Sequence, residues 1–195
     1  MRAVATPAEL SSYSGFVEHN GYVSMAAAHY TRKSDLAASR WAVLDSMGLA
    51  GQVLQAQPLQ AEPLATAGNL TSQAAVVEYD FYTRTAAAPA ITVATLPTHP
   101  LTRACSMRYG VALDNGPVEV VDFKTVGRSP EWKQNVLQNQ AQRTVNGPQL
   151  APGRHTLKLY LLDPGVLLDH ITIDLGGLRP AYGTVPETRN AATSR

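Results

Sequence analysis

Hydrophobic and polar residues alternate along much of the chain, most clearly between Thr156 and Leu162. Leu157, Leu159 and Leu161 fall on one side of this stretch, and polar residues fall on the other. A period of two is typical of a half-buried strand. Asp163-Pro164-Gly165 then predicts a tight reversal, because proline presets its backbone angle and glycine tolerates a positive one.

A second strand is expected directly after this turn, and it carries a carboxylate among its apolar positions. Strict alternation places Leu167, Ile171, Ile173 and Leu175 on one face together with Asp169. The two isoleucines favour extended backbone. An unpaired buried charge is costly, so we expect Asp169 to cap backbone amides rather than to bind a ligand.

The same reasoning predicts further strands along the rest of the chain. Asn20-Gly21 predicts a hairpin between its flanking strands, since both residues accept left-handed angles. The segment from Gly48 to Asn69 is interpreted as a long loop with little regular structure, because prolines and glycines recur in it. The expected strands are 15–19, 22–30, 40–44, 77–82, one that begins at Ile91 and stops before Pro97, 107–113, 118–123, 142–145 and the pair described above.

One short helix is expected between Glu131 and Gln140. Ser129-Pro130 is a typical start, and Trp132, Val136 and Asn139 are spaced to share one side of the helix. Short strands joined without crossover helices predict an all-β antiparallel sandwich, a jelly roll. Residues 1–14 are expected to be a lead-in, 15–187 a single sandwich domain and 188–195 a flexible tail.

Composition limits the classes of partner that this chain is expected to bind. Lys and Arg total 16 against 15 Asp and Glu, which favours a neutral partner over nucleic acid or an anionic membrane. The first residues contain no apolar signal core, and no apolar run is long enough to span a bilayer. Cys105 is the only cysteine, so no internal disulfide can form and the redox compartment stays open.

Four groups of residues resemble the C-terminal domain of glycoside hydrolase family 115. The first runs from Val17-Glu18 through Gly21-Tyr22-Val23-Ser24 to His29-Tyr30, and the second is Trp41 with Gly48 and Gly51. The third is the stretch Gly153-Arg-His-Thr-Leu-Lys158. The fourth, Asp163-Pro164-Gly165-Val166 through Ile173-Asp174 to Gly176-Gly177, is the most specific, because its strand, turn, strand and paired glycines occur together.

The resemblance implies a galactose-binding-like β-sandwich similar to family 6 carbohydrate-binding modules. The parent enzymes are xylan α-glucuronidases, which remove glucuronic acid or its methyl ether from xylan. The expected partners are therefore glucuronoxylan, the catalytic domain of a parent glycosidase or a second subunit, in an extracellular or periplasmic setting. The catalytic residues of that family lie in other domains.

The sequence departs from the family pattern in two places. Relatives carry acids where this chain has Ala26 and Ala28, and an acid there helps family 6 modules to hold a structural calcium. Methyl groups supply no oxygen ligands, so we expect no metal and no cofactor. The closing stretch Ala181 to Glu187 also differs and is expected to pack differently.

Catalysis within this chain is disfavoured by its motifs. The sequence has no nucleophile elbow, zinc-binding helix or phosphate loop, and its five histidines are not at metal-ligand spacing. Glu78 with Asp80, or Asp169 with Asp174, could form an acid and base pair, because distance sets that chemistry. Solvated strand carboxylates are far commoner, so we predict no catalytic residues.

Glycan binding is a more specific hypothesis for this chain than catalysis. A sugar site needs an exposed aromatic ring beside groups that make directed hydrogen bonds. The candidate binding residues are Tyr22, Tyr30, Trp41, Trp132 and Asn139. Each has a structural alternative: Trp132 can dock its helix, Trp41 can be buried, and the tyrosines can cover a sheet face.

An interaction domain is the other interpretation. A C-terminal sandwich can brace a catalytic domain or join two subunits through an exposed apolar surface. A groove lined by two facing aromatic rings would favour a glycan, and a flat apolar patch of roughly several hundred Å² would favour a protein partner.

Overall fold

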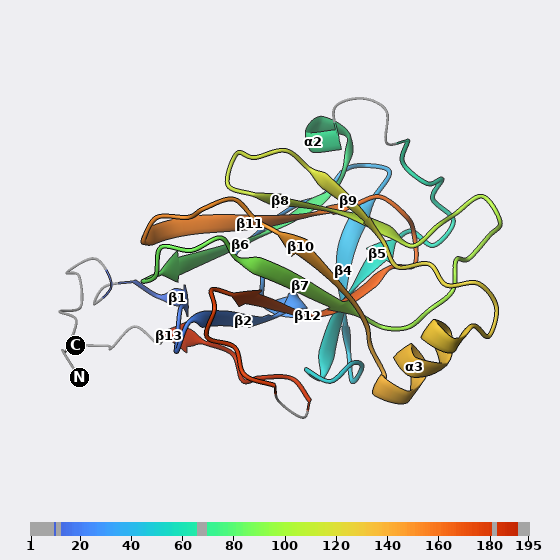
Figure 1. Cartoon of the computed structure of the whole chain (residues 1–195). Helices are drawn as coiled ribbons and strands as arrows, with labels where there is room; N and C mark the ends of the chain where they lie inside the picture. The colour runs from blue at the N-terminus through green and yellow to red at the C-terminus, as the bar shows by residue number, and fades with distance from the viewer. Residues whose placement is uncertain (1–9, 11–12, 66–69, 181–182, 191–195) are drawn as a thin grey trace.

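The computed structural model describes residues 10, 13–65, 70–180 and 183–190, which form two stacked β-sheets (Figure 1). The first sheet has seven strands in the order β13-β1-β6-β11-β8-β9, with β3 also paired to β6. These are Arg189–Asn190, Gly15–Val17, Val76–Thr83, Gly153–Leu161, Arg108–Leu113, Glu119–Asp122 and Arg32–Ser34. The all-β sandwich expected from the alternating pattern is confirmed.

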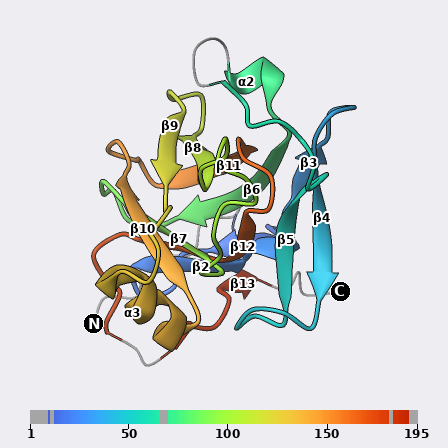
Figure 2. The same ribbon diagram turned by 90° about the vertical axis from the view of Figure 1, so that its right-hand side faces the viewer.

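The second sheet has six strands in the order β10-β7-β12-β5-β4, with β2 paired to β12. They are Ala141–Asn146, Ala90–Thr95, Leu167–Asp174, Gln52–Gln57, Arg40–Asp45 and Tyr22–Ala26. Figure 2 shows β4 and β5 standing beside the rest of the sandwich. The pairing is antiparallel with one exception, because β1 runs parallel to β6.

The main core fills the space between the two sheets. Val77, Tyr79 and Phe81 of β6 and Leu157 and Leu159 of β11 are all fully buried. Their alternation with polar neighbours is the predicted pattern, and burying one such side chain stabilises the fold by about 1.5–3 kcal/mol. The hydrophobic period of these strands therefore decides which face of each strand enters the core.

Strand β12 departs from the strict alternation expected of it. A bulge shifts its register between Leu168 and His170. Leu168 therefore joins Ile171 and Ile173 in the main core, while Leu167 packs in a smaller cluster with Val53. The prediction that Leu167 faces the same way as the isoleucines was wrong, because the extra residue of a bulge reverses the phase of the strand.

The Asn20-Gly21 turn forms, but the predicted hairpin does not. Both residues have positive φ angles, 50° and 78°, as a tight reversal requires. The ladder stops after the bridge between His19 and Tyr22. Beyond it, β1 pairs with β6 and β13, whereas β2 pairs with β12 in the other sheet. The turn is thus a crossing between the two layers.

Two other predictions need correction. The segment interpreted as a long loop contains β5, because Val53, Leu54 and Ala56 supply buried positions between the glycines and the prolines. The tail expected to be flexible begins with β13, which pairs with β1. Much of the expected lead-in and residues 191–195 lie outside the described residues.

The expected helix is α3, Pro130–Gln138, and the side chain of Ser129 accepts a hydrogen bond from the Trp132 amide. Two shorter helical turns, η1 (Ala27–His29) and α2 (Leu70–Gln73), accompany it. The buried residue of α3 is Asn135, and Val136 is 44% exposed. None of the helices in the described part of the chain is long and apolar enough to cross a membrane.

Candidate functional site

The outer face of the six-stranded sheet is hollowed under the last part of the chain. Here the side chains of β7, β10 and β12 that point away from the core form the floor, and residues 178–180 and 183–185 form a wall, with a volume of about 380 Å³. We call this hollow the sheet-face groove. Its floor and polar sides are made by Thr92, Ala94, Gln140, Gln142, His170 and Thr172.

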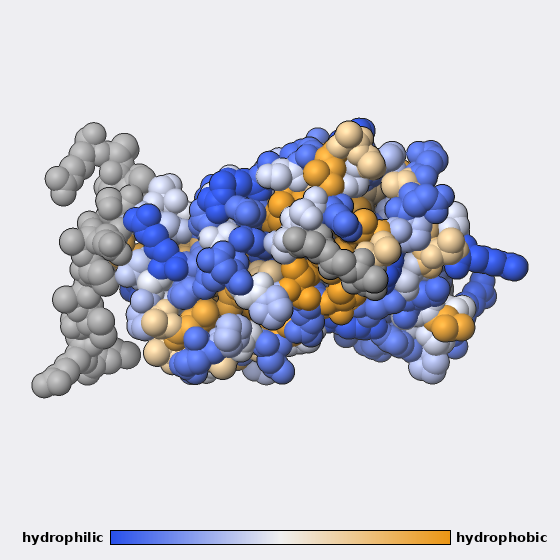
Figure 3. Space-filling view, turned by 90° about the horizontal axis from the view of Figure 1, so that it is seen from above, coloured by the Kyte–Doolittle hydropathy of each residue, from blue (hydrophilic) through white to orange (hydrophobic). Residues whose placement is uncertain are grey.

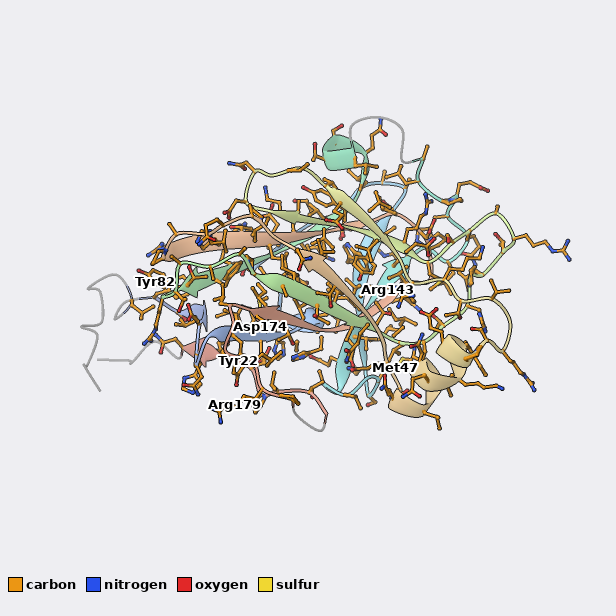
Figure 4. All side chains as sticks on the ribbon, viewed as in Figure 1. Tyr22, Met47, Tyr82, Arg143, Asp174 and Arg179 are labelled. Atoms are coloured by element: carbon orange, nitrogen blue, oxygen red, sulfur yellow. The ribbon has the colours of Figure 1, made fainter. Side chains whose placement is uncertain are left out.

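A second hollow of about 850 Å³ continues the groove toward the Asn20-Gly21 turn. It shares Leu178, Arg179, Pro180 and Val185 with the sheet-face groove and adds Tyr22. Figure 4 shows Tyr22, Asp174 and Arg179 close together at this end of the molecule. Tyr22 lies opposite Asp174 in the β2–β12 ladder, so its position is set by the sheet.

Hydrogen-bonding side chains make up most of the floor. The hydroxyls of Thr92 and Thr144 lie 2.8 Å apart across β7 and β10. The amide Nε2 of Gln142 donates to Oε1 of Gln140, whose own Nε2 donates to Asp169. Because a carboxylate only accepts, this chain of bonds orients both amides. Within the described residues, Oε1 of Gln142 has no partner and can accept from a ligand hydroxyl.

Asp169 is the buried anchor behind this floor. Its side chain is fully buried and accepts from the Leu49 amide at 3.1 Å, the Ala50 amide at 3.3 Å and Gln140 at 3.0 Å. Gly48 makes the close approach of the loop possible, since a Cβ there would lie 2.2 Å from Oδ1 of Asp169. The expectation that Asp169 caps backbone amides is confirmed.

His170 connects the floor to the wall. Its Nε2 lies 2.8 Å from the hydroxyl of Ser24, which donates to the carbonyl of Val185 at 2.9 Å. The one hydroxyl hydrogen of Ser24 is used in that bond, so Nε2 must carry a hydrogen and donate. Nδ1 of the neutral ring is then an acceptor, and it is buried with no partner among the residues that the structure describes. Burial lowers the pKa of His170, against the opposing influence of Asp169 and Glu187.

This lowered pKa predicts a loss of stability in mild acid. Above the ordinary pKa of 6.5 the ring is neutral in both the folded and the unfolded chain. As the pH falls from 6.5 toward the lower folded value, the unfolded chain takes up the proton first, so the free energy of unfolding falls. His170→Gln should flatten this decline when urea unfolding is measured at pH 7.5, 6.5 and 5.5. The exposed His19→Gln variant should retain the wild-type slope, and an equal slope in all three proteins would contradict the prediction.

Several bonds fasten the wall segment to the sheet. The carboxylate of Glu187 accepts from the Ala26 amide at 2.7 Å and contacts Nδ1 of His29 at 2.9 Å. The side-chain oxygen of Thr188 accepts from the Ser24 amide at 3.0 Å. These contacts, together with β13, hold the wall in one position over the sheet.

The region around Ala26 does not fit a calcium ion. Ala26 and Ala28 offer methyl groups, and the carboxylate of Glu187, which contacts Ala26, is already bound by an amide and a histidine. Calcium requires six to eight oxygen ligands. Among the described residues, no three His, Cys, Asp or Glu side chains are grouped so that they could hold a metal ion.

The paired glycines after β12 have a steric role. Oδ1 of Asp174 accepts from the amides of Gly176, Gly177 and Leu178, which turns the chain sharply into the wall. A Cβ on Gly177 would lie 1.9 Å from the carbonyl oxygen of Asn20. The close contact between the two turns therefore requires glycine at this position.

Comparison with known families agrees with this architecture. Residues 15–187 match the family model described as the glycosyl hydrolase family 115 (GH115) C-terminal domain. The chain belongs to this family.

Several solved structures are similar in fold to this GH115 C-terminal domain. A GH115 4-O-methyl-α-glucuronidase with specificity for decorated arabinogalactans is similar over 74% of this chain, with a TM-score of 0.55 and 24% identity. A β-(1,4)-mannanase from Podospora anserina, built of a GH26 and a CBM35 part, is similar over 83% with a TM-score of 0.51 and 13% identity.

A family 6 carbohydrate-binding module is similar over 80% of this chain and 95% of its own, with a TM-score of 0.50 and 12% identity. The chain spans 17% of the glucuronidase and 29% of the mannanase. At these identities the likeness shows the fold, a carbohydrate-binding-module-like sandwich. No match was found among curated proteins.

The GH115 C-terminal domain brings only one of the five predicted binding residues to the groove. Tyr22 is half-buried at the junction of the two hollows. Tyr30 packs against the main core, and Trp41 is 1% exposed within it. The placement of Trp41 as a sugar platform is therefore wrong, because its ring fills the space between the sheets.

Trp132 and Asn139 lie on α3, outside the lining of the groove. The ring of Trp132 is stacked on that of His99, with centroids 5.7 Å apart. Asn139 is the left-handed C-cap of the helix, with φ 53°. The residues that sequence reasoning missed are Thr92, Gln142, His170 and Arg179. Strand alternation could have identified Thr92, Gln142 and His170 as outward-facing residues. No local signal shows that their three strands and the wall meet to form one groove.

The two carboxylate pairs considered for catalysis are engaged in structural contacts. Glu78 and Asp80 both bind the guanidinium of Arg32. Burial acts to raise the pKa of Asp80, but hydrogen bonds from Arg32 and Thr156 outweigh it, and the pKa is lowered. Asp169 and Asp174 accept the backbone bonds described above. Neither pair therefore presents a free acid and base to a common space.

Proposed function

We propose that this GH115 C-terminal domain is a non-catalytic accessory module that binds plant cell-wall polysaccharide, namely glucuronoxylan, in the sheet-face groove. The observation that carries the proposal is the groove itself. It combines Tyr22, a set of oriented amide and hydroxyl groups and the guanidinium of Arg179 on one continuous surface. Sugars present apolar ring faces and rows of hydroxyls, which suit such a surface.

The test is titration calorimetry of the chain with xylo-oligosaccharides, glucuronoxylan oligosaccharides and arabinogalactan fragments, the last because of the specificity of the similar glucuronidase. Binding of the glucuronoxylan fragments, with no turnover of any of them, supports the proposal. The mass of the chain in solution is measured in parallel. Failure to bind any of these glycans would overturn the proposed function.

Tyr22→Ala tests the groove as the binding site. Loss of an aromatic contact costs about 1–1.5 kcal/mol, so we expect glycan affinity to fall about tenfold while the circular dichroism spectrum stays unchanged. Trp132→Ala is the matched control, because this half-exposed ring lies outside the groove. Equal losses in the two variants, or no loss for Tyr22→Ala, would place the binding site elsewhere.

The second candidate is a structural or dimerisation role, and exposed apolar residues on and near α3 support it. Val126 and Leu137 are each 82% exposed, and Val136 is 44% exposed. Figure 3 shows further apolar residues on the face that carries α2, bordered by polar ones. Exposed apolar patches are typical of protein interfaces. A dimer in solution that binds none of the glycans would favour this role over the first.

A further inference from the structure

A third hollow adjoins the groove on the other side of Tyr22. It has a volume of about 440 Å³ and lies between the end of β1, the residue after β6 and the segment 186–190. Two arginines, Arg84 and Arg189, line it together with His19 and Tyr22. We call it the arginine hollow. Tyr22 lines both this hollow and the continuation of the groove, so the two spaces are neighbours at this residue.

The two arginines in this hollow are free to bind an anion. In the part of the chain that the structure describes, neither guanidinium has a carboxylate partner, whereas Arg32, Arg108 and Arg143 are all in ion pairs. The guanidinium of Arg189 lies 5.4 Å from the centroid of the Phe16 ring. Such stacking holds the flat group while leaving its edge, which carries the N–H donors, available to a ligand.

The two carboxylates of the lining already have partners. Glu18 is 5% exposed, and its oxygens accept from the amides of Arg84 and Thr85 and from the hydroxyl of Thr85. Glu187 accepts from the Ala26 amide and contacts His29. The oxygens of both carboxylates are thus engaged by donors of the fold, and among the described residues neither carboxylate forms an ion pair with Arg84 or Arg189.

The fold also fixes the backbone positions of both arginines. Arg84 directly follows β6, and its backbone amide is bound by the buried Glu18. Arg189 belongs to β13 and lies opposite Phe16 in the ladder with β1. Of the two guanidinium groups, that of Arg189 is also placed by its contact with the Phe16 ring, so it loses less entropy when it binds a planar anion.

We infer that the arginine hollow is a subsite for an anionic group on the glycan, a carboxylate carried on a side branch of the chain that occupies the groove. Arg84 and Arg189 bind the carboxylate oxygens, and the ring of Tyr22 separates the branch from the main chain. This inference rests on the proposed function, because it assigns the neutral part of the ligand to the groove.

The test compares a glucuronic-acid-bearing xylo-oligosaccharide with its methyl ester, which has the same shape without the charge. We expect the acid to bind about tenfold more tightly at low salt, and the difference to shrink at 0.5 M NaCl because exposed charges are screened. The double variant Arg84→Gln/Arg189→Gln should bind the acid and the ester equally. Arg128→Gln, which also removes an exposed arginine without a partner among the described residues, should leave the ratio unchanged.

The outcomes separate the inference from the proposed function. Equal affinity for acid and ester in the wild-type chain would overturn the anionic subsite and leave glycan binding in place. The double variant could keep the affinity ratio of acid to ester while Arg179→Gln loses it. This result would also overturn the anionic subsite, because the carboxylate would then bind within the groove. A sulfated oligosaccharide that binds while the carboxylate does not would overturn the choice of carboxylate. No binding of any oligosaccharide would overturn the proposed function as well.

Discussion

Asp169→Ala is expected to lower the free energy of unfolding by about 3–4 kcal/mol. The carboxylate is fully buried and accepts three hydrogen bonds, from the Leu49 amide, the Ala50 amide and Gln140. Its removal leaves these donors facing a small cavity without the carboxylate oxygens that they bind. Each buried donor left unpaired costs about 1–3 kcal/mol, and the losses are not additive.

The same variant should also lower glycan affinity. Asp169 orients the amide of Gln140, which in turn orients the amide of Gln142 in the groove. Urea unfolding measures the stability, and oligosaccharide titration of the folded variant measures the binding. Asp45→Ala is the control, since Asp45 is exposed and accepts one bond from Gln52; its effect should stay below about 0.5 kcal/mol. A loss of less than about 1 kcal/mol for Asp169→Ala would show that this carboxylate is not the anchor of the floor.

Trp41→Ala is expected to cost about 3–5 kcal/mol. The indole is 1% exposed in the main core, and truncating it leaves a cavity between the sheets that neighbouring side chains fill only in part. Chemical denaturation measures the loss. If Trp41 were instead a sugar platform, the variant would remain stable and lose glycan affinity.

Trp41→Phe refines this prediction. Among the described residues the indole nitrogen has no hydrogen-bond partner, so phenylalanine keeps most of the apolar contact and removes no described bond. We expect a smaller loss of about 1–2 kcal/mol. Trp132→Ala, on the surface of α3, should cost less than either variant. A Trp132→Ala loss equal to that of Trp41→Ala would contradict the burial difference between the two indoles.

Local rules were reliable where a pattern depends on near neighbours. The alternation in β6 and β11, the cap of α3 at Ser129 and the turn at Asn20-Gly21 follow from side-chain size and backbone angles. The role of Asp169 was also predictable, because a carboxylate in an apolar register must find donors. Resemblance in four groups of residues was sufficient to indicate the family.

The groove could not be read from the chain in this way. Tyr22, Gln142, His170 and Arg179 are far apart in the sequence and meet because β2, β10 and β12 occupy one sheet under the closing segment. Trp41 and Tyr22 look alike as aromatic residues in strands. Only packing between the sheets buries one and leaves the other at the edge of a hollow.

The sequence by itself determined that this protein is a sandwich of short strands, since a period of two is a property of each strand alone. Tertiary structure decided which strands share a sheet, where β12 bulges and which polar residues converge, because these depend on contacts between distant segments. The free energy of such long-range contacts is set by the whole packed arrangement, and no local stretch encodes it.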